Sequence, residues 1–141
     1  EVAVEVCLTS NEVILGVRGD EHPLPDFLDA GVPVVLATDD EGVARIDLTH
    51  EYQLATTRYG LDYRTLKTIS RNSLYHSFLD GSSLWASSEY DTYAAPCGSA
   101  SPATPSVPDR CRSFLDANPK AAAEWRLERD FLRFEQSFLS R

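Results

Sequence analysis

Several features that define common protein classes are missing from this 141-residue sequence. Methionine does not occur at all, Lys and Arg form no block, and no apolar run approaches the roughly 20 residues that cross a bilayer. The 13 Lys and Arg residues face 22 Asp and Glu residues, which gives a formal net charge of −9. Such a chain repels phosphate backbones, so we expect no nucleic-acid partner. Because no apolar run is long enough to cross a bilayer, we expect no membrane partner either.

The absence of methionine also bears on the start of the chain. Residue 1 is Glu, and an alternating apolar pattern begins at the next residue. Natural chains begin with Met, and few domains open inside a strand. We therefore expect this chain to be a piece of a longer polypeptide, whose remainder holds part of any active site.

Most sequence signatures of catalytic sites are missing too. There is no GxSxG, no Gly-rich phosphate loop and no CxxC. The three histidines, His22, His50 and His76, form neither an HxH pair nor an HExxH motif, so the chain alone lacks a histidine-rich zinc site. Surface or hydrogen-bonded histidines are the favoured interpretation for all three.

What is present begins with an α/β pattern. Residues 2–9 alternate apolar and polar positions, which predicts a strand that Ser10 and Asn11 end. Residues 23–30 predict a short helix that starts with Pro and stops before Gly31. Residues 32–38 are apolar on both faces, as in a parallel strand covered on both sides. Together these elements predict a strand–helix–strand unit.

Helices dominate the rest of the chain. We expect one over 49–59, a second from an Asp62 cap to about Leu79, a short one near 108–115, and a last one after the Asn118-Pro119 pair. Residues 80–108 are rich in Ser, Ala, Gly and Pro and predict a long loop. The last helix carries an apolar stripe that we expect to be docked, formed by Leu127, Phe131, Phe134 and Phe138.

The three cysteines leave two interpretations open. Cys97 and Cys111 flank the Pro/Ser-rich segment, whereas Cys7 falls in the first strand. One possibility is a 97–111 disulfide with a buried free Cys7, which would indicate an oxidising compartment. The other is that both flanking residues are unpaired thiols.

Two adjacent carboxylates form the sharpest local feature, Asp39 and Asp40, directly after the second strand. Ligand sites of parallel α/β sheets and barrels form at that end of the strands. Asp39 continues the face of Val35 and Ala37, which in a barrel is the interior. Two acids there suit a metal ligand beside a hydrogen-bond acceptor. An acidic turn that caps the next segment is the simpler alternative.

Five separated segments together resemble the C-terminal part of the adenosine deaminase family of metal-dependent amidohydrolase barrels. They are EVCLTSN (5–11), HPLPDFLDAGVPVVLATDD (22–40), LTHEYQLA (48–55), LKTISRNSLYHSFL (66–79) and KAAAEWRLERDFLRFE (120–135). The last segment and the cysteine-bearing insertion before it are most similar to the secreted, growth-factor-like branch.

This resemblance implies an α/β chain that forms the C-terminal portion of a (β/α)8 TIM-type barrel. Residues 1–79 would be the last two β/α units, 80–117 an insertion, and 118–141 a helix packed on the barrel. Asp39 matches the family's zinc ligand, which also orients the attacking water and so counts as catalytic. Asp40 matches the aspartate that binds the purine at N7. The implied reaction is zinc-dependent hydrolysis of adenosine to inosine and ammonia.

The sequence departs from the family pattern at two positions, because Glu41 and Leu8 stand where proline is usual. The family's histidines and general-acid glutamate have no counterpart here, so residues 1–141 alone should be inactive and should bind zinc poorly. The missing partner would be the N-terminal barrel half of the same protein, in an extracytoplasmic compartment. A deaminase of another aminopurine nucleoside and a non-catalytic binding or structural module remain the alternatives.

Overall fold

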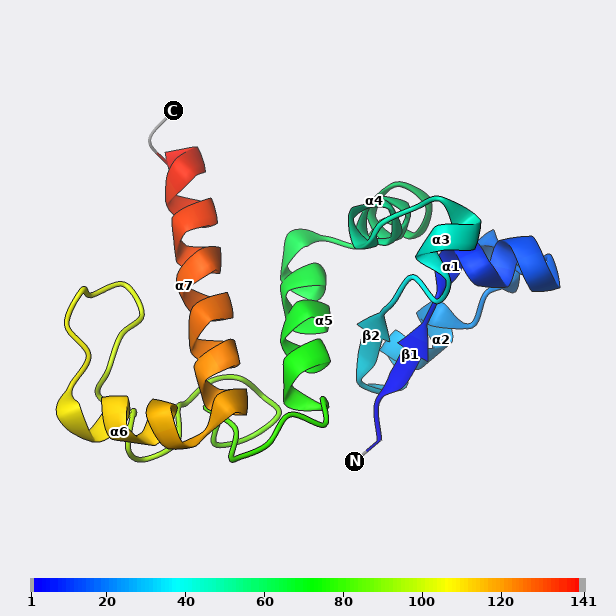
Figure 1. Ribbon diagram of the computed structural model, residues 1–141. Coiled ribbons are helices and arrows are strands. Elements are labelled where there is room, and N and C mark those ends of the chain that lie inside the picture. Colours follow the sequence, from blue (N-terminus) through cyan, green and yellow to red (C-terminus); the bar gives the residue numbers. More distant parts are fainter. Residues whose placement is uncertain (1, 140–141) are drawn as a thin grey trace. The chain divides into compact units, whose positions relative to one another are not determined.

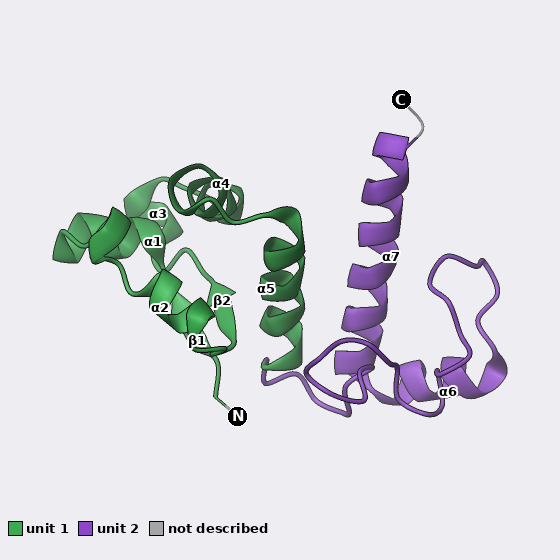
Figure 2. Ribbon diagram, turned by 180° about the vertical axis from the view of Figure 1, so that it is seen from behind, with its two compact units in different colours: residues 1–76 green, residues 77–141 purple. Residues whose placement is uncertain are grey.

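The computed structural model describes residues 2–139. It divides into two compact units, Glu1–His76 and Ser77–Arg141, which are coloured separately in Figure 2. The sequence-based boundary at residue 79 lies three positions after the observed one. The predicted insertion, 80–117, and the predicted C-terminal segment, 118–141, fall in the same unit.

Unit 1 is built on a pair of parallel strands, β1 (Val4–Val6) and β2 (Val34–Leu36), which lie side by side in Figure 1. Their register places Val4 opposite Val34 and Val6 opposite Leu36. Between them the chain forms four short helices: α1 (Leu8–Ser10), the π-helix η1 (Asn11–Leu15), the 3-10 helix η2 (Gly19–Glu21) and α2 (Leu24–Asp29). The predicted parallel strand–helix–strand order is confirmed.

The predicted extent of the first strand is wrong. The alternating pattern suggested a strand over 2–9, but β1 ends at Val6 and the chain turns helical at Leu8. Ser10 and Asn11, which were expected to end the strand, lie instead within the consecutive helices α1 and η1. Period-2 alternation and a helix start overlap at these positions, and local sequence does not distinguish them.

Three helices follow β2 in unit 1: α3 (Glu41–Ala44), α4 (Leu48–Tyr59) and α5 (Tyr63–Tyr75). Helix α4 ends at Gly60, whose left-handed φ of 65° is unfavourable for residues that carry a side chain. Helix α5 starts at Asp62, whose carboxylate accepts from Thr65 N, as predicted. It ends four residues before the predicted Leu79.

The core of unit 1 lies where α2, α4 and α5 cover the strand pair. Helix α5 is anchored on β2 by Asn72, whose buried side-chain amide donates to Val34 O at 2.9 Å. The fully or nearly fully buried apolar residues are Val6, Leu8, Leu24, Val34, Leu36, Ala55 and Ile69.

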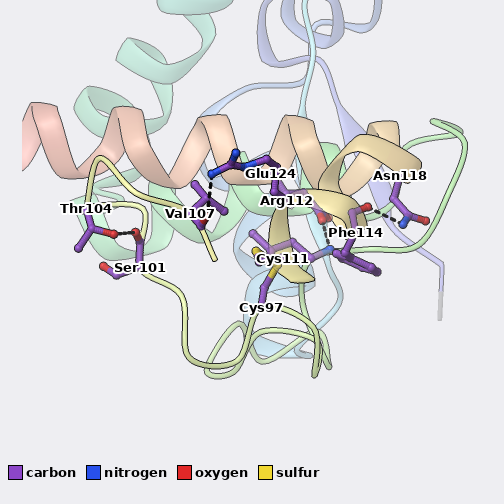
Figure 3. The surroundings of a disulfide bond; sticks show 10 residues. Cys97, Ser101, Thr104, Val107, Cys111, Arg112, Phe114, Asn118 and Glu124 are labelled. Atoms are coloured by element: carbon purple, nitrogen blue, oxygen red, sulfur yellow. Dashed lines mark hydrogen bonds between the residues drawn. A yellow bond between two sulfur atoms is a disulfide. The ribbon is translucent and has the colours of Figure 1, made fainter. Parts of the chain in front are cut away.

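Unit 2 contains α6 (Asp109–Ala117) and α7 (Pro119–Leu139), preceded by the predicted long loop. The loop is fixed by a disulfide between Cys97 and Cys111, which Figure 3 shows beside α6, and this decides between the two cysteine interpretations. Cys7 is free, as predicted, but only partly buried. A second core surrounds the disulfide with Leu84, Ala121 and Trp125.

The apolar stripe predicted on the last helix is not buried along its length. Phe134 and Phe138 are 51% and 58% exposed and contact each other. Helix α7 instead buries a face that includes two carboxylates, Glu124 and Glu128, together with Ala121 and Trp125. Within residues 2–139 we find no helix of sufficient length and apolarity for a membrane span.

Candidate active-site edge

Asp39 lies at the carboxyl end of the strand pair, three residues after β2 ends at Leu36. Its backbone adopts a left-handed conformation with φ of 59°, which Asp and Asn tolerate better than other side chains. The side chain is exposed, and no ion pair to Lys or Arg is found for it among the described residues. The carboxylate is therefore available at the edge where ligands of parallel sheets bind.

Ser10 holds one oxygen of that carboxylate. Its hydroxyl donates to Asp39 Oδ2 at 2.7 Å. Ser10 ends α1, which begins shortly after β1 ends, so the contact joins the carboxyl ends of both strands. The second oxygen, Oδ1, has no hydrogen bond within residues 2–139. Sequence reasoning missed Ser10 as a site residue, although it belongs to the EVCLTSN segment.

Glu51 fixes the backbone of the residues directly before Ser10. This wholly buried residue of α4 accepts from Leu8 N at 2.7 Å and from Thr9 N at 3.2 Å. Those N–H groups begin α1, whose N-cap Cys7 makes no side-chain cap. Helix starts need acceptors for their first N–H groups, so Glu51 caps α1 across 43 residues of sequence.

Asp40 takes the capping role that the simpler interpretation of the acidic pair describes. It is the N-cap of α3, and its Oδ1 accepts from Val43 N at 3.4 Å. It is exposed and uses only this one oxygen among the described contacts. A second role for Asp40 in substrate binding is compatible with this geometry and stays a prediction.

His22 is a buried, hydrogen-bonded histidine, in agreement with the favoured interpretation. Its Nδ1 accepts from Leu24 N at 3.0 Å, so the neutral ring carries its proton on Nε2. That nitrogen lies 2.8 Å from the Asn11 side-chain amide, which must present its oxygen there. Burial lowers the pKa of His22, partly offset by the negative charge of Glu51. Both nitrogens are thus occupied within the fold.

The residues that the structure describes do not form a metal site by themselves. Within residues 2–139 no group of three or more His, Cys, Asp or Glu side chains could hold a metal ion. The pKa of the Cys7 thiol is raised by burial and then by the charges of Glu5, Asp39 and Glu51, which disfavours the thiolate that metals bind. The donor set therefore fits one carboxylate arm, Asp39, of a site that needs about three or four ligands.

Comparison with known proteins finds similar chains among the deaminases. The model of the family described as adenosine deaminase matches residues 1–84. An aminodeoxyfutalosine deaminase of Streptomyces coelicolor is 42% identical over 96 residues, covering 67% of this chain and 25% of that protein. An adenosine deaminase of Aliivibrio fischeri is 45% identical over 82 residues, covering 57% and 25%.

A solved structure, that of the ADAL–IMP complex, aligns with a TM-score of 0.52 and 35% sequence identity. The alignment covers 56% of this chain and 24% of that one. The chain thus spans about a quarter of the length of the relatives it matches. These matches and the parallel strand pair confirm the predicted mixed α/β class and agree with a C-terminal portion of a (β/α)8 barrel.

Proposed function

Because the chain belongs to the adenosine deaminase family, we propose that the whole protein is a zinc-dependent hydrolase that converts adenosine to inosine and ammonia. The relatives are named deaminases, which are hydrolytic enzymes. In this proposal the chain contributes Asp39 as a zinc ligand and Asp40 as a substrate contact. The remaining zinc ligands come from other parts of the protein.

The observation that carries the proposal is the arrangement of Asp39 and Ser10. The Ser10 hydroxyl occupies Oδ2 of Asp39, which leaves Oδ1 available at the strand ends. A ligand whose second oxygen is fixed by a hydrogen bond keeps its orientation, and such contacts are worth about 10–100-fold in metal affinity or activity. Zinc, when bound, lowers the pKa of a water molecule and so supplies a nucleophile near neutral pH.

Asp40 has a chemical requirement of its own in this proposal. Purine N7 is only an acceptor, so the Asp40 carboxyl must carry a proton when it donates there. The cap bond to Val43 N uses Oδ1 and leaves Oδ2 for that proton. Replacing Asp40 by Asn keeps an acceptor for the cap and a donor for N7. Asp40→Asn should therefore retain more activity than Asp40→Ala.

A nucleoside suits this edge better than a nucleotide. A substrate phosphate needs Arg or Lys nearby, and the loops that follow the two strands contain Arg18 and Arg45. Arg18 Nη1 is already 3.3 Å from Glu12 Oε1. Glu12 also pairs with Arg58, and the hydrogen bonds from Arg58 and Arg18 lower the pKa of Glu12. Arg18 is thus partly neutralised.

A second substrate deserves a direct comparison, because one of the most similar relatives is named an aminodeoxyfutalosine deaminase. The test measures ammonia release by the full-length protein with adenosine, aminodeoxyfutalosine, 2′-deoxyadenosine and AMP. We expect the highest kcat/KM with adenosine. Faster turnover of aminodeoxyfutalosine would make that compound the proposed substrate in place of adenosine, with the same hydrolytic deamination. No turnover of any of the four by zinc-loaded enzyme would favour the non-catalytic alternative.

The isolated chain provides a second arm of that test. Residues 1–141, expressed in cells lacking other deaminases, should release no ammonia from adenosine. Measurable deamination by this chain would contradict the division of ligands proposed here.

We further propose an extracytoplasmic location, supported by the Cys97–Cys111 disulfide, since such bonds persist in oxidising compartments. Fractionation of the source cells with thiol labelling tests it. Recovery of the protein in the cytosol with both thiols reduced would contradict it.

A further inference from the structure

Unit 2 forms a pocket of about 340 Å³ that involves no residue of unit 1. One wall is the Pro-rich loop 102–107, and the other is one face of α7. The α7 residues follow helical 4-3-4 spacing: Trp125, Arg129, Leu132 and Gln136. The volume lies near the lower end of the roughly 300–1,000 Å³ of small-molecule sites, so the pocket suits a small ligand.

The loop wall is held in place before any ligand arrives. The disulfide anchors the segment at both ends, and Arg112 Nη2 donates to Val107 O at 3.0 Å, as Figure 3 shows. Thr104 Oγ1 lies 2.9 Å from Ser101 O and donates to it. Prolines at positions 102 and 105 fix φ there. A preformed wall lowers the entropic cost of binding.

Arg129 gives the pocket its chemical preference. Its Nε–H is buried and has no hydrogen-bond partner among the described residues. A buried donor without an acceptor is unfavourable, and an incoming acceptor would recover that cost. Arg133 also lines the pocket, although its Nη1 lies 3.3 Å from Asp130 Oδ1, and no Asp or Glu is among the lining residues. The pocket therefore favours an anion.

Apolar side chains share the lining with Arg129, Arg133, Thr104 and Gln136. Trp125 and Pro102 are buried, and Leu132 and Val107 complete the apolar surface. A bare inorganic anion would leave the exposed parts of Leu132 and Val107 in contact with water, whereas a compact apolar body would cover them.

We propose that this pocket binds a small organic carboxylate with an aromatic or branched aliphatic body. Once the partly exposed Arg129 side chain turns toward the ligand, the carboxylate accepts from its Nε–H and the neighbouring guanidinium N–H, the paired geometry in which Arg holds carboxylates. The apolar body lies against Trp125. This site is independent of the deaminase proposal, because it uses neither Asp39 nor Asp40.

The experiment titrates the 141-residue chain with benzoate by calorimetry and by NMR of the arginine Nε–H groups. We expect saturable one-site binding and a downfield shift of the Arg129 Nε–H proton. Arg129→Met should weaken binding at least tenfold. The matched control is Arg126→Met, which makes the same charge change at an exposed position on the same helix, outside the pocket lining, and should bind as wild type.

Two further ligands decide the matter without a variant. Benzamide, which has the same ring but no charge, should bind the unmodified chain at least tenfold more weakly than benzoate, and so should inorganic phosphate. Equal binding of benzoate and benzamide would overturn the carboxylate pairing, and equal binding of phosphate would overturn the apolar contact. Equal affinities of the two arginine variants, or no saturable benzoate binding, would overturn the site itself.

Discussion

Glu51 should be the most stabilising polar residue of unit 1, and Glu51→Ala tests this. The carboxylate is 0% exposed and accepts from Leu8 N and Thr9 N. Removing it leaves two backbone donors without acceptors, each at a cost of about 1–3 kcal/mol, and leaves a cavity. The Ala variant no longer has the desolvation cost of a buried carboxylate, which offsets part of this loss. We therefore expect unit 1 to lose about 3 kcal/mol of unfolding free energy.

The assay must report on unit 1. Both tryptophans, Trp85 and Trp125, lie in unit 2, so urea unfolding of unit 1 is the part of the far-UV circular dichroism change that tryptophan fluorescence does not follow. Amide hydrogen exchange adds site resolution. A loss of about 3 kcal/mol corresponds to roughly 100-fold faster exchange at Leu8 and Thr9 where these amides exchange by the same opening.

Two variants calibrate the result. Glu51→Gln keeps one acceptor oxygen and should cost about 1–2 kcal/mol, since one of the two charge-assisted bonds is lost. Gln53→Ala changes an exposed residue of the same helix and should stay within about 0.5 kcal/mol of wild type. If Glu51→Ala unfolds no more readily than Gln53→Ala, with unchanged exchange at Leu8 and Thr9, the capping argument fails.

Three further predictions concern protonation and the disulfide. Burial raises the pKa of Glu124, so its contribution to the unfolding free energy of unit 2 is greatest at low pH and falls as pH rises through that pKa. Urea unfolding followed by tryptophan fluorescence at pH 4.5 and 7.5 should show this decline in the wild type and not in Glu124→Gln. The same pH dependence in both proteins would refute it. Burial lowers the pKa of His22, so its contribution to the unfolding free energy of unit 1 is complete above about pH 6.5 and is lost as pH falls through the folded-state pKa. In His22→Gln, the loss of stability on acidification, measured by circular dichroism, should be smaller than in the wild type. An equal loss in both proteins would refute this. Reduction of Cys97–Cys111, which closes a 14-residue separation, should cost unit 2 about 3 kcal/mol in urea unfolding, and an unchanged midpoint would refute it.

Features with local sequence signals were predictable. Gly60 ends α4 and Asp62 starts α5 because a left-handed glycine and a capping carboxylate act within a few residues. The same holds for the start of α7 at Pro119. The position of Asp39 at a strand end followed from the apolar run before it. These signals come from residues that are neighbours in the chain.

Features that depend on distant residues were not predictable. The helical turn at Leu8 relies on an acceptor from Glu51, and the orientation of the Asp39 carboxylate relies on Ser10, 29 residues earlier. The groups that donate to Glu124 are likewise remote in the sequence, because its carboxylate accepts from Leu84 N and Ser83 Oγ. No short pattern marks such pairs, so the sequence indicated the main carboxylate of the candidate site without the groups that orient it.

The most direct test of the account measures zinc and activity together in the full-length protein with Asp39→Ala. The matched control is Asp20→Ala, an exposed aspartate of the same unit. The account predicts that the control keeps about one zinc per chain and full adenosine turnover, whereas Asp39→Ala binds zinc at least tenfold more weakly and loses at least 100-fold in kcat. Zinc content and turnover in Asp39→Ala equal to those of the control would contradict it.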